Sequence, residues 1–376
     1  MMKKIAGITW WKGNYGSILQ AYALGKVIER IGDVDYEILR QYTVNSFSIP
    51  SLLKYIKAKG FIETIKDAKK KYGNRSLRDR KRKCEEFIRN NMRISSRSYS
   101  ADDRKSIEDD YDGFICGSDQ IWNPVFTSRS GIYWLGFSNH VLKIAYAPSI
   151  GITDANEVMK EEIRCALQSF KAISCRENEG TKLINSIMGE GICQTVLDPT
   201  LLLTRKEWDS LVTDSSIKDA YVFSYILRGT DEQRKMVKRF AKENGLRLVT
   251  IPFLEAEYRT SLDGKYADIN FTDASPIDFI SLIKNATYVF TDSFHCMIFS
   301  CIFHRTFFSL KKTGKNQMLR INDFQSWLNI GNRVIENYDD ILRLLETDMD
   351  SVWINFENRV CEERKKSLEY LHRALS

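Results

Sequence analysis

The sequence predicts an α/β protein built from two doubly wound parallel sheets, one in each half of the chain. At 376 residues the chain is longer than most single domains, which favours two. Short apolar runs rich in Val, Ile, Phe and Tyr alternate with longer runs of helical periodicity, a pattern typical of parallel sheets. The alternation begins again near residue 219, so we predict two Rossmann-like domains that face each other across a cleft.

The first predicted domain covers residues 1–204. It opens with a strand, a polar glycine turn, a helix that Ser17 caps and Gly32 ends, and a second strand. Thr204 is expected to cap the helix that leads to the second domain. The predicted strands are 3–10, 35–42, 112–118, 143–151, 172–177 and 195–203, and the predicted helices are 17–32 and 157–170.

The second predicted domain covers residues 219–350 and repeats this alternation. Ser275 followed by Pro276 is a typical helix start. A long charged helix over 351–376 closes the chain, and we expect it to pack back on the first domain. The predicted strands are 220–227, 246–253, 287–293 and 305–310, and the predicted helices are 231–245, 275–286, 294–303 and 316–331.

Residues of about 47–106 form a predicted helical insertion in the first domain, with a strongly basic centre. The stretch 54–97 holds 16 Lys or Arg against five Asp or Glu, more positive charge than the net +7 of the whole chain. Two interpretations stay open: a solvated helical face, or contact with an anionic partner such as a membrane surface or a lipid-diphosphate-linked substrate. Nucleic acid is disfavoured, because only Tyr72 and Phe87 offer stacking groups in the most basic run.

Composition indicates a cytoplasmic protein. The chain is 43% hydrophobic and 28% charged, and no apolar run reaches the roughly 20 residues that a membrane helix needs. The first ten residues lack the long apolar stretch and cleavage site of a signal peptide. The eight cysteines are scattered without a CxxC pair, which favours free thiols over disulfides and predicts no metal site.

Polar residues follow several predicted strands at the point where each strand ends. In a doubly wound sheet ligands bind beyond these carboxyl ends. The densest run is GSDQIWNP at 117–124, which has more polar groups than a simple turn needs. We therefore predict a cleft-lining loop that Trp122 and Pro124 stiffen. Three other polar segments follow predicted strands: 14–17, 176–177 and 198–200. For each of them a structural role as a turn, a cap or a surface ion pair explains the residues as well as a functional role does.

His295 is the most informative single residue. It is one of four histidines, and it stands at a strand-to-helix junction just after Asp292 and Ser293. A helix N-terminus favours anions, and a histidine there can transfer protons near neutral pH. Asp292 is a candidate to orient it, and a purely structural hydrogen-bonded histidine is the alternative. A hydrolase triad is disfavoured, because the GxSxG motif is absent.

Six motifs, taken in order, give the chain a resemblance to a known family. They are GNYGSILQAYAL, GSDQIWNP, KIAYAPSIG, SCRE, LDPTLLL and TDSFHCMIF, and the matches run from about residue 7 to 330. Each alone is unspecific, but the ordered set resembles the polysaccharide pyruvyl transferase family. The resemblance implies a fold like that of the GT-B glycosyltransferases, which have two Rossmann-like domains with a cleft between them.

The resemblance also implies a reaction and its partners. Pyruvate moves from the co-substrate phosphoenolpyruvate to two hydroxyls of one sugar, forming a cyclic ketal in surface or exopolysaccharide biosynthesis. A general acid must protonate the methylene carbon, a base must take hydroxyl protons, and cations must hold the phosphate and carboxylate. No metal or redox cofactor is required. The sugar acceptor is open, and the basic stretch 54–97 extends the hypothesis to a lipid-linked acceptor at the inner face of the cell membrane.

The same resemblance implies roles for individual residues. His295 matches the family's histidine and is assigned as the general acid or base, with Asp119 as a candidate base. The residues assigned to the donor are Arg176, Ser293, Lys312 and Arg320. The residues assigned to the acceptor are Asn14, Tyr15, Gly16, Ser118, Gln120 and Asn123.

One departure from the family pattern bears on the donor. Many members carry Arg-Leu-His where this chain has Ser-Phe-His at 293–295, so one anion-binding arginine is missing. Lys311, Lys312 and Arg228 are candidates to replace its charge, and Ser293 still offers a hydrogen bond. Two further hypotheses therefore stay open: a GT-B-like glycosyltransferase that uses a nucleotide sugar, and a non-catalytic glycan-binding homologue.

Overall fold

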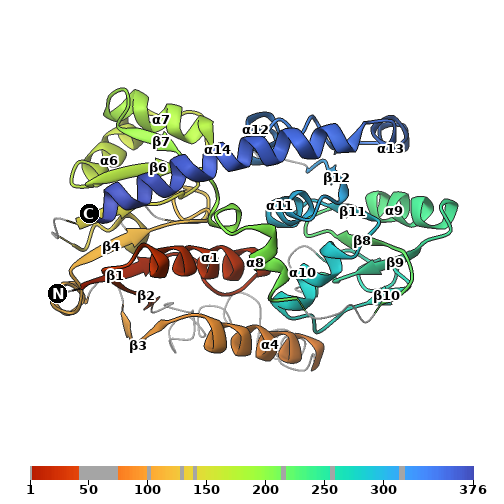
Figure 1. The fold of residues 1–376 in the computed structure, drawn as a ribbon, viewed down its shortest axis with the longest axis horizontal. Helices are drawn as coiled ribbons and strands as arrows, with labels where there is room; N and C mark the ends of the chain where they lie inside the picture. The colour runs from red at the N-terminus through yellow and green to blue at the C-terminus, as the bar shows by residue number, and fades with distance from the viewer. Residues whose placement is uncertain are drawn as a thin grey trace, which may run out of the picture.

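The computed structural model describes residues 2–41, 75–99, 103–127, 131–138, 142–212, 217–254, 259–312 and 318–376. Within these ranges the chain forms two parallel sheets, one in each half, which confirms the predicted α/β class (Figure 1). Both faces of the first sheet are buried, because Ile5 and Ile115 join one apolar cluster while Ala6 and Phe114 join another. Successive strand residues point to opposite faces, so these apolar runs need cover on both sides.

The first sheet has the strand order of a Rossmann fold, β3-β2-β1-β4-β5-β6-β7. The order reverses between β1 and β4, which are paired in parallel, so the loops that follow these two strands border the same crevice. The strands are β1 (Lys3–Ile8), β2 (Val34–Gln41), β3 (Ile94–Tyr99), β4 (Gly113–Cys116), β5 (Leu142–Ala145), β6 (Ala172–Cys175) and β7 (Cys193–Thr195).

The second sheet repeats this plan with the order β10-β9-β8-β11-β12-β13. Its reversal lies between β8 and β11, so the loops after these strands border the second crevice. The strands are β8 (Tyr221–Tyr225), β9 (Arg247–Thr250), β10 (Ile269–Asn270), β11 (Tyr288–Thr291), β12 (Thr306–Leu310) and β13 (Val334–Ile335).

Most helices begin at a side chain that caps their free backbone amides. Thr204 and Ser275 do so with capping boxes, as expected. The first helix is capped by Asn14 rather than by Ser17, whose amide donates to the Asn14 side chain, so that prediction was wrong by three residues. The helices are α1 (Tyr15–Ile31), α4 (Arg75–Asn91), α5 (Arg104–Asp110), α6 (Glu157–Leu167), α7 (Asn178–Met188), α8 (Arg205–Asp209), α9 (Asp231–Glu243), α10 (Pro276–Lys284), α11 (Phe294–Ile302), α12 (Leu319–Trp327), α13 (Tyr338–Leu345) and α14 (Met349–Leu375), with short 3₁₀ turns η1 (Ile132–Trp134) and η2 (Pro199–Leu201).

The predicted helical insertion of about 47–106 needs a correction at its end. Residues 75–91 form the expected helix α4, but 94–99 form β3, the edge strand beside β2. The polar sequence ISSRSY hides this strand, because only Ser95 and Tyr99 are buried in it and its pairing partner lies on one side only. Residues 42–74 lie outside the described residues.

The predicted strand over 195–203 also needs a correction. β7 ends at Thr195, and 199–201 form the 3₁₀ turn η2. The cause is local, since Asp198 accepts the Thr200 amide at 3.0 Å and Pro199 offers no amide to a strand ladder.

The two domains are packed against each other rather than simply linked. Tyr15 at the start of α1 stacks on Phe279 of α10 with 4.9 Å between ring centroids, and its hydroxyl donates to the carbonyl of Ala274 at 2.8 Å. From the basic helix α4, Arg80 donates to the carbonyl of Thr272 and Lys83 pairs with Asp273 at 2.7 Å. Part of the basic charge of α4 therefore binds the second domain.

The last helix, α14, runs from the second domain back along the first (Figure 1). On the first domain, the Tyr370 hydroxyl donates to the carbonyl of Ala145 at 2.8 Å, and the Ser367 hydroxyl accepts the amide of Leu197 at 3.0 Å. Lys3 donates to the carbonyl of Leu375 at 3.0 Å, so the two ends of the described chain are joined. In the described ranges, no helix combines the length and apolarity needed to cross a membrane.

Candidate functional site

The loop after β4 is folded tightly against its neighbours. Gly117 has φ of +120°, and a Cβ added there would lie 2.8 Å from the carbonyl carbon of Tyr146, so only glycine fits. Asp119 adopts a left-handed φ of 70°, which is costly for a residue with a side chain and is often found at functional sites. The Asp119 carbonyl accepts the amide of Ser149 at 2.8 Å, which ties the loop to the segment after β5.

This fold of the loop aims the Asp119 carboxylate at the start of α1. One oxygen accepts the Ser17 hydroxyl at 2.6 Å, and the other accepts the amide of Gln120 at 2.8 Å. Gln20 of α1 accepts the amide of Ser118 at 3.2 Å. The loops after β1 and β4 thus meet at the crevice where the strand order reverses.

A buried ion pair lies beside Asp119. Arg176, just after β6, donates from Nη1 to Asp198 Oδ2 at 2.8 Å, and its Nη2 lies 4.0 Å from Asp119 Oδ1. Burial raises the pKa of the Asp198 carboxyl, but the His295 imidazole, Arg176 and the Thr200 hydroxyl outweigh it and hold the pKa well below its usual range. Asp198 is therefore an anion at neutral pH, although it is 2% exposed.

His295 joins this cluster from the other domain. Its Nε2 lies 3.5 Å from Asp198 Oδ2, the oxygen that Arg176 also contacts, and it makes no aligned hydrogen bond with the described residues. On its other side the imidazole lies against Gly16, where an added Cβ would be 2.6 Å from the His295 Cγ. The histidine is thus held between a carboxylate and a glycine of the first domain.

Replacing Gly16 with alanine is expected to lower the free energy of unfolding by about 1–3 kcal/mol, because the new methyl group overpacks the domain interface at His295. Chemical denaturation measures this change. Gly25→Ala in the same helix is the matched control: its methyl group would meet Tyr36 at an ordinary 3.5 Å, and the variant should gain about 0.5–1 kcal/mol in stability. Equal stabilities for the two variants would contradict the contact.

Asp292, the sequence candidate to orient His295, has another partner. Its two oxygens accept the amides of Leu227 and Arg228, each at 2.7 Å, and so fix the loop after β8. The carboxylate beside His295 is instead Asp198, which sequence reasoning explained as a turn. Asp198 does form that turn through Thr200, and its second oxygen is left for the site.

Positive charge gathers around Phe294, next to His295. The guanidinium of Arg176 lies over the Phe294 ring at 4.5 Å, and that of Arg320 lies 5.5 Å from the same ring centre. Burial and the neighbouring Arg176 lower the pKa of Arg320 to about 10, so it stays charged at neutral pH. Burial also lowers the pKa of Lys312, with Arg320 and Arg228 acting in the same direction against Asp292.

Several of these donors are free to bind a ligand. In the part of the chain that the structure describes, Lys312 and Arg320 form no salt bridge, and Nε and Nη2 of Arg176 are buried without a hydrogen-bond partner. Lys311 differs from its neighbour, because it pairs with Glu336 at 2.7 Å and is exposed. Of the sequence candidates to replace the missing arginine, Lys312 and Arg228 lie within electrostatic range of Arg320, whereas Lys311 is paired with Glu336.

The remaining predicted residues take mostly structural positions around this cluster. Asn14 is exposed and caps α1, while Tyr15 is buried with its hydroxyl bonded to the other domain. The Ser118 hydroxyl donates to the carbonyl of Ala147 at 2.8 Å, and Asn123 donates to the Gln120 side chain at 3.2 Å. Contacts therefore join Asp119, Arg176, Asp198, His295 and Arg320, with Gly16 against the imidazole and Lys312 within electrostatic range of Arg320. Ser293 precedes them at the start of α11, and Asn14 and Gln120 bond to Ser17 and Asp119 beside the cluster.

Glu177 is a further residue of this region, named in the sequence motif SCRE without a role. One of its oxygens accepts the Ser149 hydroxyl and the amides of Ile150 and Gly151, at 2.8 to 3.0 Å. It thereby holds the segment after β5 against β6. Its place directly after Arg176, at the end of a predicted strand, is the sequence signal for it.

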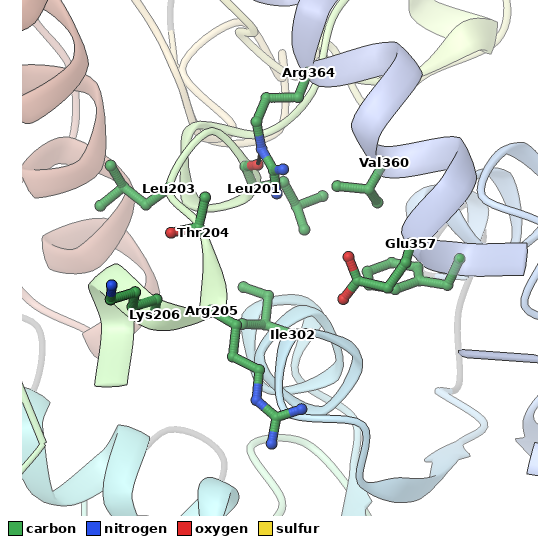
Figure 2. A pocket seen from close by; sticks show the side chains of 10 residues that line it. Leu201, Leu203, Thr204, Arg205, Lys206, Ile302, Glu357, Val360 and Arg364 are labelled. Carbon is green, nitrogen blue, oxygen red and sulfur yellow. Dashed lines mark hydrogen bonds between the residues drawn. The ribbon is translucent and has the colours of Figure 1, made fainter. Parts of the chain in front are cut away.

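A separate pocket of about 220 Å³ lies where the segment 201–206, α11 and α14 meet (Figure 2). Figure 2 shows Glu357 and Val360 of α14 on one side of it, opposite Thr204 and Leu203. It shares no lining residue with the cluster around His295. No group of three or more metal-ligating side chains occurs within the described residues.

Comparisons with known proteins fit this geometry. A protein-family model described as polysaccharide pyruvyl transferase matches residues 14–311. Arabidopsis thaliana UGT89C1 in complex with UDP-L-rhamnose is similar in structure at 9% sequence identity and a TM-score of 0.56, over 100% of this chain and 99% of that one. The UDP-GlcNAc 2-epimerase from Methanocaldococcus jannaschii is similar at 13% identity and a TM-score of 0.52, over 92% and 93% of the two chains.

The UDP-GlcNAc 2-epimerase from Neisseria meningitidis bound to UDP-GlcNAc is a third similar structure, at 8% identity and a TM-score of 0.51, over 98% of this chain and 99% of that one. At such identities the likeness shows the fold alone, the two-domain GT-B arrangement. None of the curated protein sequences compared with the chain matches it.

Proposed function

Because the chain belongs to the polysaccharide pyruvyl transferase family, we propose that it transfers pyruvate from phosphoenolpyruvate to two hydroxyls of a sugar, as a cyclic ketal. One observation carries the proposal: His295 lies 3.5 Å from the buried carboxylate of Asp198, next to the free cations Lys312 and Arg320. This arrangement combines a proton-transfer group with an anion site, and phosphoenolpyruvate needs both.

The proposed chemistry balances without another reactant. His295, protonated and stabilised by Asp198, gives its proton to the methylene carbon of phosphoenolpyruvate, and positive charge develops on the adjacent carbon. A sugar hydroxyl attacks that carbon and loses its proton to the imidazole or to Asp119. The second hydroxyl then displaces phosphate, which carries away the other proton. The products are one ketal and one inorganic phosphate.

Three positive groups suit the two anionic ends of this donor. Phosphoenolpyruvate carries a phosphate and a carboxylate. Arg176 and Arg320 lie around Phe294, and Lys312 adds a third positive group within electrostatic range of Arg320. Ser293, at the start of α11, adds a hydroxyl next to a helix N-terminus. Because Gly16 and His295 are in contact, we infer that the domains separate to admit substrates and close again around them.

Phosphoenolpyruvate is expected to raise the melting temperature of the protein, since a ligand at 100 times its dissociation constant adds about 2.7 kcal/mol to folded-state stability. Lys312→Met should weaken its binding about tenfold or more, because a hydrogen bond to a charged group contributes about 1.5–3 kcal/mol. Titration of the melting temperature measures both effects.

Lys311→Met is the matched control for this experiment, because Lys311 directly precedes Lys312 in the chain and its charge is paired with Glu336. It should bind phosphoenolpyruvate like the wild type. A shift with UDP- or GDP-sugars and none with phosphoenolpyruvate would contradict the donor assignment and favour the glycosyltransferase hypothesis. Equal losses in both lysine variants would contradict the proposed place of the anion site.

The cellular role of the protein is part of the same proposal. Family membership supports a role in polysaccharide biosynthesis and a sugar acceptor. A cytoplasmic location, an exopolysaccharide product and a lipid-linked acceptor held through residues 54–97 are proposed with it. Of that stretch, residues 54–74 lie outside the described residues, and Arg80 and Lys83 bind the second domain. Sedimentation with anionic and neutral liposomes tests the membrane contact.

A further inference from the structure

Three aromatic side chains form a continuous rim beside the site. We call Trp10, Phe126 and Tyr133 the aromatic rim. Trp10 contacts Phe126 edge to face at 6.1 Å between ring centroids, and it contacts Tyr133 in the same way at 6.4 Å. Phe126 is 42% exposed, and it is the one aromatic among the large apolar side chains that are exposed in the described part of the chain. Single exposed apolar residues are common, so it is the place of Phe126 on an aromatic cluster beside the site that makes it a candidate contact surface.

The rim is close to the acceptor side of the site. Trp10 lies in the loop between β1 and α1, and its carbonyl accepts from Gln20, the residue that also accepts the Ser118 amide. Phe126 lies on the loop that carries Asp119. Burial, together with the charge of Asp119, raises the pKa of Tyr133 to about 12, so the Asp119 carboxylate lies within electrostatic range of the rim.

The rim is also held in place. The Tyr133 hydroxyl donates to the Gln41 side chain at 2.9 Å, and Gln41 donates to the carbonyl of Thr9 at 3.1 Å. The Phe126 amide donates to the carbonyl of Asn123 at 3.0 Å. Three separate segments thus fix the rings before any ligand arrives, which lowers the entropy that binding costs.

We propose that the aromatic rim is a stacking platform for a pyranose ring of the acceptor glycan. The C–H groups of a sugar ring form an apolar, weakly positive face that packs on the electron-rich face of an aromatic ring. The sugar hydroxyls stay at its edge, where they keep their contact with water. The assignment to the acceptor rests on the proposed pyruvyl transfer, whereas binding of a glycan to the rim does not.

The test compares purified wild-type protein with Phe126→Leu on an array of pyranose oligosaccharides, without phosphoenolpyruvate, followed by titration of the best-bound glycan. Leucine keeps an apolar side chain and removes the ring, so the variant should bind about fivefold to tenfold more weakly. Phe126→Tyr keeps an aromatic ring and should bind like the wild type. Val125→Ala is the matched control, because Val125 is 75% exposed on the same turn and has no ring; it should bind like the wild type.

Each other result overturns the platform. Wild-type protein that binds no pyranose glycan overturns it, as does a Phe126→Leu variant that binds like the wild type or no worse than Val125→Ala. A change of molecular mass in Phe126→Leu by light scattering would assign the rim to contact between two copies of the chain instead.

Phosphate release from phosphoenolpyruvate, measured in parallel, keeps this outcome separate from the proposed function. Glycan-dependent release with an unchanged acceptor KM in Phe126→Leu overturns the platform and leaves pyruvyl transfer standing. Ring-dependent glycan binding without any phosphate release supports the platform and overturns pyruvyl transfer.

Discussion

Replacing His295 with glutamine should lower phosphoenolpyruvate-dependent phosphate release by about 10²–10⁴-fold, the usual contribution of a general acid or base. Glutamine keeps a polar side chain of similar reach but cannot carry a proton to the methylene carbon. Glutamine fills the same space between Asp198, 3.5 Å away, and Gly16, so the fold should not change. The melting temperature should therefore stay close to that of the wild type.

Two measurements decide this prediction. Phosphate release under single-turnover conditions reports the chemical step, and circular dichroism reports the fold. His372→Gln is the matched control, because His372 is exposed near the end of α14 and should leave the rate unchanged. A His295→Gln variant that is folded and retains most of its turnover would remove His295 from the mechanism.

Replacing Arg176 with methionine should lower the free energy of unfolding by about 3–5 kcal/mol, the range found when one partner of a buried ion pair is removed. The variant leaves the Asp198 carboxylate 2% exposed and without the guanidinium that lies 2.8 Å away in the wild type. It should also lose the thermal shift with phosphoenolpyruvate, because Arg176 supplies free donors to the anion site.

The second domain offers a matched control for this variant. Arg234 and Asp263 form a similarly buried pair at 2.8 Å, away from His295. Arg234→Met should be destabilised to a comparable degree and should still respond to phosphoenolpyruvate. If both variants lose the shift, Arg176 acts on stability alone and its place in the donor site is wrong.

The cost of Arg176→Met should also depend on pH. In the wild type the pKa of Asp198 lies well below its unfolded value of about 3.9, so this carboxylate stabilises the fold above that pH and loses its contribution as the pH falls. Without Arg176 the buried carboxylate is destabilising, and a lower pH relieves the variant by protonating it. Urea unfolding at pH 7 and pH 4 should therefore show a smaller difference between the two proteins at pH 4.

The sequence predicted the two sheets well, because their buried strands read as short apolar runs between helices. It missed the edge strands β3, β10 and β13 and the helices α7 and α13, and it failed at 199–201, where a local Asp198 turn replaces the apolar pattern. A strand that is buried on both faces is recognised by its apolar run, whereas a short polar strand at the edge of a sheet has no such run.

The sequence named several residues that the structure brings together, but it did not predict which of them are in contact. Asp292 stands three residues before His295, so it was the natural candidate to orient the imidazole, yet it fixes the loop after β8. Asp198 comes from the other half of the chain, and only the packing of two domains brings it to His295. In the same way, the neighbours Lys311 and Lys312 look alike in the sequence, yet Lys311 is exposed and paired with Glu336 while Lys312 is half-buried near Arg320.

The return of α14 to the first domain has a consequence for recombining members of this fold. The connection between the halves looks like a single joint at the segment 204–219, but the last helix belongs to the first half through Tyr370 and Ser367. A chimera cut once would place a foreign α14 against the surface of β5 and η2. A cut at the joint and a second cut before Met349 keep the surface that Tyr370 and Ser367 contact, whereas Glu357 and Arg359 in the first half of α14 would meet a foreign second domain in place of His304 and Trp327. The exchangeable unit is therefore an interior segment of the chain, matched at these contacts, and not its C-terminal half.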